Sequence, residues 1–244
     1  CERLKKTAKI VFFLTIQKSN IMNTEKNIKT LIIKTPLELD CGKTINNFPI
    51  AYETYGTLNS KKDNAILVFH ALTGDQFVTG INPLTKKDGW WSYAVGPDKA
   101  IDTNKYFVIC SNVIGGCMGS YGPSHKNPET QNIFGTNFPV ITINDMVNAQ
   151  YNLLDHFGID KLFCVTGGSM GGMQVLQFIT NFPDKAKTVV PIATTSSHSA
   201  QNIAFNELGR QAITADSNWK DGNYNLNNTN PGKGLAVARM AAHI

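Results

Sequence analysis

The sequence predicts an α/β fold, in which helices cover both faces of a mostly parallel β-sheet. Four short apolar runs, each bounded by polar or turn-forming residues, are typical of strands that a parallel sheet buries on both faces. Helical patterns lie between these runs. Strands that alternate with helices favour right-handed crossovers and therefore a parallel sheet. The 244 residues are enough for one large domain, or for one domain with an insertion.

The expected strands follow in chain order. Residues 30–34 and 49–55 have the composition of strands, and the second stretch alternates with the period of two that a strand requires. The four apolar runs predict further strands at residues 65–69, 106–110, 162–166 and 188–193.

Helices are expected between and after these strands. The helical patterns cover residues 143–157, 170–182, 203–215 and 235–244, and Gly158 and Pro183 end the first two. Residues 112–139 show neither pattern and are rich in Gly, Pro, Ser and Asn. Because structureless stretches of this length are uncommon in a compact domain, we expect this loop to be functional.

We divide the chain into three parts. Residues 1–29 are an N-terminal extension, residues 30–215 are the α/β core, and residues 216–244 begin a lid. The apolar run at residues 10–14 is too short to cross a bilayer, which takes about 20 residues. We therefore expect residues 1–21 to be upstream sequence or a disordered extension, and not a targeting signal.

Charge and cysteine content exclude several classes of protein. Residues 1–34 carry eight Lys or Arg and two acidic residues, whereas the rest of the chain carries 15 Lys or Arg and 16 Asp or Glu. The body is therefore neutral, which argues against a nucleic-acid-binding protein. We expect no membrane partner either, because the apolar run at residues 10–14 is too short to span one. The five cysteines are odd in number and show no CxxC and no metal-ligand spacing, so we expect buried free thiols in a reducing compartment and no metal; they are Cys1, Cys41, Cys110, Cys117 and Cys164. We also expect a cytoplasmic protein without a permanently bound cofactor.

The main chemical signal is the sequence Gly-Gly-Ser-Met-Gly-Gly at residues 167–172. It fits the G-x-S-x-G motif and lies directly after an expected buried strand and before an expected helix, as in the nucleophile elbow of α/β-hydrolases. Gly167 and Gly171 lack the Cβ atoms that would clash in so tight a turn. Ser169 is thus the predicted nucleophile, and the amide of Met170, at the helix N-terminus, is a predicted oxyanion donor. A glycine-rich turn without catalysis is the alternative interpretation.

The second signal is the loop at residues 70–75, His-Ala-Leu-Thr-Gly-Asp, which follows the strand at 65–69. In α/β-hydrolases this loop supplies the other oxyanion-hole amide, which we assign to Leu72. His70 precedes the serine, whereas the catalytic base of this fold follows it. We therefore interpret His70 as a residue that braces the loop.

Together with other segments, these motifs resemble the homoserine O-acyltransferases, the homoserine O-acetyltransferase family of the α/β-hydrolase fold. The sequence Gly-Gly-Ser-Met-Gly-Gly-Met-Gln at residues 167–174 is far more specific than G-x-S-x-G alone. The resemblance runs from about residue 37 to residue 244; its further segments are residues 52–59, 70–75, 90–91, 112–120, 122–124, 138–139, 205–207, 209–213, 234–235 and 238–240.

The resemblance implies a two-step acyl transfer. Ser169 attacks the thioester of acetyl-CoA, or of succinyl-CoA, and the amides of Leu72 and Met170 hold the oxyanion. The γ-hydroxyl of L-homoserine then takes the acyl group, on the route to methionine. A covalent ester divides one difficult step into two, and a dry pocket favours homoserine over water. The implied partners are L-homoserine and acyl-CoA, and we expect a homodimer.

An amino-acid substrate also needs a cation for its carboxylate. In the family an arginine of the lid region does this, and Arg239 matches its Ala-Arg-Met motif. The planar guanidinium suits a carboxylate because it can bind both oxygens. Arg210 is the competing candidate, although we expect it to brace the lid helix.

The sequence departs from the family in the rest of the catalytic triad, whose acid and histidine should follow Ser169. Asp216 or Asp221 with His243 would have the right order, but no strand is expected between residues 200 and 244 to carry them. We therefore expect a C-terminally truncated fragment, inactive alone, whose triad Asp and His lie beyond residue 244.

Three functions stay open from the sequence. The first is the acyltransferase. The second keeps the fold and Ser169 but uses water as the acceptor, which makes an esterase. The third is a catalytically inactive fragment that binds ligands or partners. The choice between acetyl and succinyl donors, and between homoserine and serine acceptors, is also open.

Overall fold

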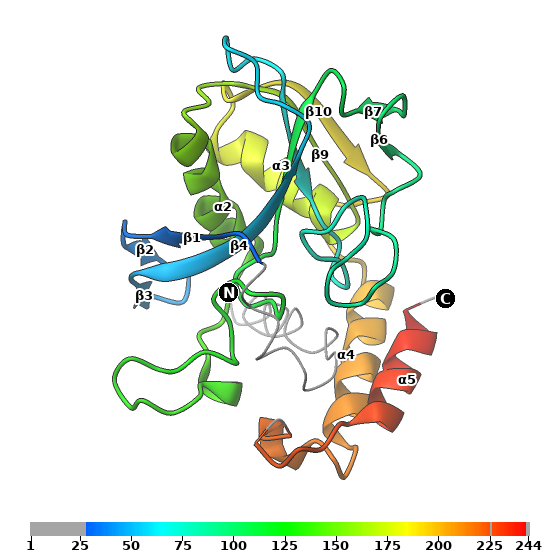
Figure 1. Cartoon of the computed structure of the whole chain (residues 1–244). Helices are drawn as coiled ribbons and strands as arrows, with labels where there is room; N and C mark the ends of the chain where they lie inside the picture. The colour runs from blue at the N-terminus through cyan, green and yellow to red at the C-terminus, as the bar shows by residue number, and fades with distance from the viewer. Residues whose placement is uncertain (1–27, 225, 243–244) are drawn as a thin grey trace.

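A six-stranded sheet forms the centre of the molecule. The computed structural model describes residues 28–224 and 226–242 (Figure 1). The sheet has the order β1-β4-β8-β5-β9-β10; its strands are β1 (Thr30–Ile33), β4 (Phe48–Tyr55), β5 (Ala65–Phe69), β8 (Phe107–Ser111), β9 (Leu162–Gly168) and β10 (Ala186–Ile192). β8, β5, β9 and β10 are parallel, whereas β4 pairs antiparallel with β1 and with β8. The carboxyl ends of β5 and β9 are therefore neighbours at one edge of the sheet.

The other elements of the described residues are four helices and several short segments. The helices are α2 (Ile143–Phe157), α3 (Met170–Asn181), α4 (Ala200–Thr214) and α5 (Gly232–Ala241). The short segments are β2 (Leu37–Glu38), β3 (Thr44–Ile45), β6 (Val95–Gly96), β7 (Ile101–Asp102) and two 3₁₀ turns, η3 (Gly135–Asn137) and η4 (Lys220–Gly222). The long loop expected at residues 112–139 contains η3 and is otherwise irregular.

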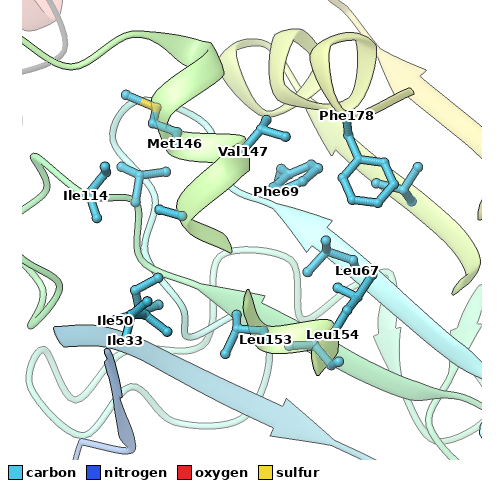
Figure 2. Packing of buried hydrophobic residues seen from close by; sticks show 14 of the residues in the cluster. Ile33, Ile50, Leu67, Phe69, Ile114, Met146, Val147, Leu153, Leu154 and Phe178 are labelled. Atoms are coloured by element: carbon cyan, nitrogen blue, oxygen red, sulfur yellow. The ribbon is translucent and has the colours of Figure 1, made fainter. Parts of the chain in front are cut away.

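The main core lies between the sheet and the helices α2 and α3. Strand residues alternate between the two faces of the sheet, so Leu67 and Phe69 of β5 join this core while Ile66 and Val68 point to the other face. Figure 2 shows Phe69 packed between Val147 of α2 and Phe178 of α3. Apolar burial of this kind is the dominant stabilising term and fixes the positions of α2 and α3 on the sheet.

The opposite face of the sheet has a different cover. There the apolar cluster combines strand residues with Val78 and Val95 from the segment between β5 and β8, and Trp90 and Trp91 pack against it. This segment is irregular apart from β6 and β7. In the described part of the chain, helices thus cover one face, and a long loop takes the place that we expected helices to fill on the other.

Local sequence signals set the ends of α2. Thr142 accepts a hydrogen bond from the amide of Asp145, whose carboxylate accepts one from the amide of Thr142, so the two form a capping box. Gly158 follows the helix with φ of 64°, the left-handed conformation in which glycine is least strained. These signals explain why the predicted and observed bounds of α2 agree.

Helices α4 and α5 pack on each other as a hairpin (Figure 1). A separate small cluster of Ile213, Trp219 and Ala238 holds them together, and a Cβ at Gly234 would lie 2.3 Å from the carbonyl oxygen of Ala212. The predicted boundary between core and lid at residue 216 separates α4 from α5, whereas their packing favours one unit that contains both. Most of the predicted extension at residues 1–29 lies outside the described residues.

The connection between α4 and α5 also touches the loop at residues 112–139. A Cβ at Gly222 of η4 would lie 2.3 Å from Cγ2 of Thr136 in η3, and the φ of Gly222 is 86°. Tyr224 lies close enough to Cys117 for the thiol to influence it electrostatically, and burial raises the pKa of Tyr224 to about 12. The segment that joins α4 to α5 is therefore in contact with the loop at residues 112–139.

Two general expectations can be checked on the described residues. Among them, no helix combines the length and the apolarity needed to cross a membrane. Of the four cysteines in this range, Cys110 and Cys164 are buried, and none forms a disulfide.

Candidate active site

Ser169 stands in a strained turn between β9 and α3. Its φ of 56° and ψ of −120° are far from the regions that non-glycine residues favour. The turn is close-packed on both sides: a Cβ at Gly167 would lie 2.7 Å from the carbonyl oxygen of Phe69, and one at Gly171 would lie 2.1 Å from the same atom. The two glycines of the motif are thus required by the backbone of β5, as the sequence predicted.

The strand next to β9 helps to hold this turn. The amide of Ser169 donates to the carbonyl of Ile192 (3.0 Å), and the hydroxyl of Thr194 donates to the carbonyl of Ser169 (2.8 Å). A Cβ at Gly172 would lie 2.5 Å from Cβ of Thr194, so the last glycine of the motif is needed as well. The end of β10 therefore fixes the serine backbone from the side opposite to β5.

The structure brings the two predicted oxyanion segments together. Met170 is the first residue of α3 and is buried, and its amide belongs to the helix N-terminus, where backbone N–H groups are available to an anion. Leu72 is half-buried and packs against the main core. The close approach of Gly171 to Phe69 and His70 holds the start of the Leu72 loop against the first turn of α3.

His70 is buried and neutral, and it connects two loops. Its Nδ1 lies 2.7 Å from the carbonyl oxygen of Ala71, which can only accept, so Nδ1 carries the proton. Its Nε2 then accepts from the amide of Val113 and from Nδ2 of Asn112, each at 3.2 Å. Burial lowers the pKa of His70 to about 4. These contacts agree with the loop-bracing role expected from the sequence.

A buried chain of side-chain hydrogen bonds supports the same loop from α3. The hydroxyl of Ser111 donates to Gln150 (2.6 Å), whose amide donates to Gln174 (2.7 Å). The amide of Gln174 in turn donates to the carbonyl of His70 (3.3 Å). All three side chains are fully or almost fully buried. These hydrogen bonds were not predicted from the sequence. The one signal that could have indicated them is the presence of glutamines within apolar helical patterns.

The loop after β8 is fixed by Asn112 and Ser120. Oδ1 of Asn112 accepts from the amide of Met118 (3.0 Å), and Ser120 donates to the carbonyl of Asn112 (2.5 Å) while accepting from the amide of Ala51 (2.9 Å). Both residues are buried. The glycine-rich segment around residues 115–119 is therefore ordered by its own polar side chains and rests on β4.

Asp75 is the last residue of the predicted oxyanion loop and its only acidic group. Its carboxylate accepts from the amide of Phe77 (2.8 Å) and from Nδ2 of Asn82 (3.0 Å), and its carbonyl accepts from the indole of Trp90 (2.8 Å). Burial raises the pKa of Asp75 to about 6, against the lowering effect of those hydrogen bonds. The residue anchors the segment that covers the second face of the sheet.

The two arginines of the lid have different surroundings. Arg239 lies on α5 and is exposed, so its predicted contact with a substrate carboxylate stays a prediction. Arg210 is mostly buried on α4 and forms an ion pair with Glu207 one turn away. That pair agrees with the expected bracing role of Arg210.

The groups considered for an in-chain triad are not brought together. The carboxylate of Asp216 accepts from the amides of Gly234 (2.9 Å) and Asn218 (2.9 Å), so it caps α5. Asp221 lies in η4, and His243 lies outside the described residues. The expectation that the triad acid and base lie elsewhere stays a prediction. Within residues 28–224 and 226–242, no group of three or more His, Cys, Asp or Glu side chains is arranged to hold a metal ion.

A strained serine between a parallel strand and a helix, with the loop that follows the neighbouring strand beside it, is typical of one class of protein. A family model described as alpha/beta hydrolase fold matches residues 64–243, and the chain belongs to this family. The predicted fold class is confirmed.

Individual relatives give a more specific comparison than the family model. The chain is 74% identical over 223 residues to a homoserine O-acetyltransferase of Pelagibacter ubique, which covers 91% of this chain and 60% of that protein. It is 61% identical over 209 residues to a homoserine O-acetyltransferase of Mesorhizobium japonicum, which covers 86% of this chain and 54% of the relative. The resemblance drawn from the sequence motifs is confirmed, and the chain spans 54–60% of the length of these two relatives.

Solved structures give the same fold and two activities. A homoserine O-acetyltransferase from Bacillus anthracis superposes with a TM-score of 0.79 at 31% identity, over 89% of this chain and 59% of that one. Esterase E22 superposes with a TM-score of 0.78 at 32% identity, over 88% of this chain and 60% of that one. The fold is thus common to a solved homoserine O-acetyltransferase and a solved esterase.

Proposed function

We propose that the whole protein transfers an acetyl group from acetyl-CoA to the γ-hydroxyl of L-homoserine, with Ser169 as the nucleophile. The observation that carries the proposal is the strained Ser169 between β9 and α3, within a sequence 74% identical to a homoserine O-acetyltransferase. The resemblance also supports a place in methionine biosynthesis and a homodimer, and both stay predictions.

The first half of the reaction forms a seryl ester. A general base takes the proton of the Ser169 hydroxyl as its oxygen attacks the thioester carbonyl. The negative charge that develops on the carbonyl oxygen is held by the amides of Leu72 and Met170, one from the loop after β5 and one from the N-terminus of α3. The carbon–sulfur bond then breaks, and CoA leaves as a thiol with the proton from the base.

The second half transfers the acyl group to the acceptor. The γ-hydroxyl of homoserine gives its proton to the base and attacks the seryl ester through the same oxyanion geometry. The ester bond to Ser169 breaks, the serine regains its proton, and O-acetyl-homoserine leaves. We propose Arg239, exposed on α5 in this structure, as the cation for the homoserine carboxylate.

The test replaces Ser169 in the whole protein and measures CoA release with acetyl-CoA and L-homoserine. Ser169→Ala should lower the rate by about 10³-fold or more, because the nucleophile is lost while the oxyanion donors remain. Ser60→Ala is the matched control, since Ser60 is exposed in the turn that precedes β5. A Ser169→Ala variant that keeps its rate would contradict the assignment.

An esterase is the second candidate because esterase E22 has almost the same fold similarity as the solved transferase. The two functions share every step up to the seryl ester and differ in the acceptor. Measuring O-acetyl-homoserine against free acetate in one reaction separates them. Acetate as the main product at millimolar homoserine would favour the esterase.

A further inference from the structure

The peptide between Ala71 and Leu72 is held by its carbonyl. The oxygen of Ala71 accepts from Nδ1 of His70 at 2.7 Å and from the amide of Gly74 at 2.8 Å. No peptide bond among the described residues is cis, so the N–H of Leu72 points away from the carbonyl in the same plane. The two bonds that fix the oxygen therefore fix the direction of the Leu72 amide.

His70 is itself held from three sides. Its carbonyl accepts from Gln174 of α3, and its Nε2 accepts from Val113 and Asn112 of the loop after β8. The ring is 1% exposed, so water does not compete for these bonds. His70 thus connects two elements to a single peptide plane: α3 through its backbone carbonyl, and the loop after β8 through its imidazole.

We propose that His70 is a positioning residue that aims the Leu72 amide at the oxyanion, through the hydrogen bond from Nδ1 to the carbonyl of Ala71. The two ring nitrogens have separate tasks: Nδ1 sets the peptide plane, and Nε2 attaches the ring to the loop at residues 112–113. The inference rests on the proposed function only in taking Ser169 and Leu72 as the acylation machinery.

Two variants separate the tasks. The amide nitrogen of Asn at position 70 has nearly the reach of Nδ1 and can donate to Ala71, but it cannot reach Val113. The longer side chain of Gln can accept from Val113, but its amide lies too far out to donate to Ala71. His70→Asn should therefore keep the peptide plane, and His70→Gln should keep the link between the loops.

The assay is the burst of p-nitrophenol from p-nitrophenyl acetate in the whole protein, with thermal stability measured on the same samples. It follows acylation of Ser169 and needs neither CoA nor homoserine. We expect His70→Gln to acylate about 10²-fold more slowly, as when one oxyanion donor is lost, and His70→Asn to stay within about threefold of the wild type. His156→Ala, at the exposed end of α2, is the histidine control.

The outcomes are decisive in both directions. A His70→Gln variant that acylates at the wild-type rate overturns the proposal, and so do rates that only follow the loss of thermal stability. If the variants do not fold, the imidazole ¹⁵N shifts of the wild type decide: a proton on Nδ1 supports the proposal, and a proton on Nε2 overturns it. A normal burst without transfer to homoserine would instead refute the proposed function and leave the role of His70 intact.

Discussion

Replacing Gly171 by alanine tests the close approach of α3 to β5. A Cβ at this position would lie 2.1 Å from the carbonyl oxygen of Phe69 and 2.9 Å from its carbonyl carbon. Both are backbone atoms in a fully buried strand, so neither can rotate away as a side chain would. The helix or the strand has to move, and Ser169 lies in the turn between them.

The expected cost follows from that overlap. Real Cβ contacts almost never fall below 3.0 Å, so the backbones have to separate by about 1 Å, and overpacking of this kind costs about 1–3 kcal/mol, occasionally more. Alanine favours a helix over glycine by about 1 kcal/mol, which offsets part of the cost. We therefore expect Gly171→Ala to lower the free energy of unfolding by about 1–2 kcal/mol, because both clashing atoms are backbone, and to reduce acylation of Ser169 sharply.

Gly168→Ala is the matched control in the same turn. A Cβ there would meet only the carbonyl oxygen of Ile192, at 3.9 Å, which is an ordinary contact. The free energies of unfolding in urea should place Gly168→Ala at or slightly above the wild type and Gly171→Ala clearly below it. Equal stability of the two variants would refute the reasoning.

Three further predictions concern stability. Burial lowers the pKa of His70 from 6.5 to about 4, so the neutral imidazole stabilises the fold fully above pH 6.5. Up to about 3 kcal/mol of the free energy of unfolding is lost as the pH falls through 4. Urea unfolding of His70→Asn should not show this loss. The raised pKa of Asp75 works in the opposite direction: its contribution to stability is fully present below pH 3.8 and falls by up to about 3 kcal/mol as the pH rises through 6. The free energy of unfolding of Asp75→Asn should therefore exceed that of the wild type at pH 8 but not at pH 3.5. Thr142→Val removes the acceptor of the α2 capping box and should cost about 1 kcal/mol in the same urea assay, whereas an unchanged midpoint would mean that the cap contributes nothing.

The sheet could be predicted from the sequence because its strands carry a local signal. The apolar run at residues 65–69 is β5 with the same bounds, and the runs near residues 107 and 162 are β8 and β9. Each is apolar on both faces because the sheet is covered on both faces. The apolar runs do not predict which residues cover the second face of the sheet. Val78, Val95 and Trp90 do so, and they belong to a segment with no repeating pattern.

The nucleophile turn was predictable for a different reason, namely that its geometry has steric requirements. Gly167 and Gly171 are needed wherever a strand enters a helix so tightly, and the observed distances to Phe69 give the cause. The lid arginine is not of this kind. Nothing in the local sequence around Arg239 determines whether the side chain faces a ligand or the solvent. The family motif therefore identified Arg239 as a candidate but did not predict the direction of its side chain.

The polar network of Ser111, Gln150 and Gln174 could not be predicted from the pattern of any single helix. Gln150 and Gln174 look like the solvent-facing positions of two amphipathic helices, yet both are buried because α2 and α3 pack against each other on one face of the sheet. A buried amide is costly unless it is paired, and the two glutamines pair with each other, with Ser111 and with the carbonyl of His70. Their pairing, and its contact with the carbonyl of His70, arises from tertiary packing, and it links the helix that begins after Ser169 to the loop that carries Leu72.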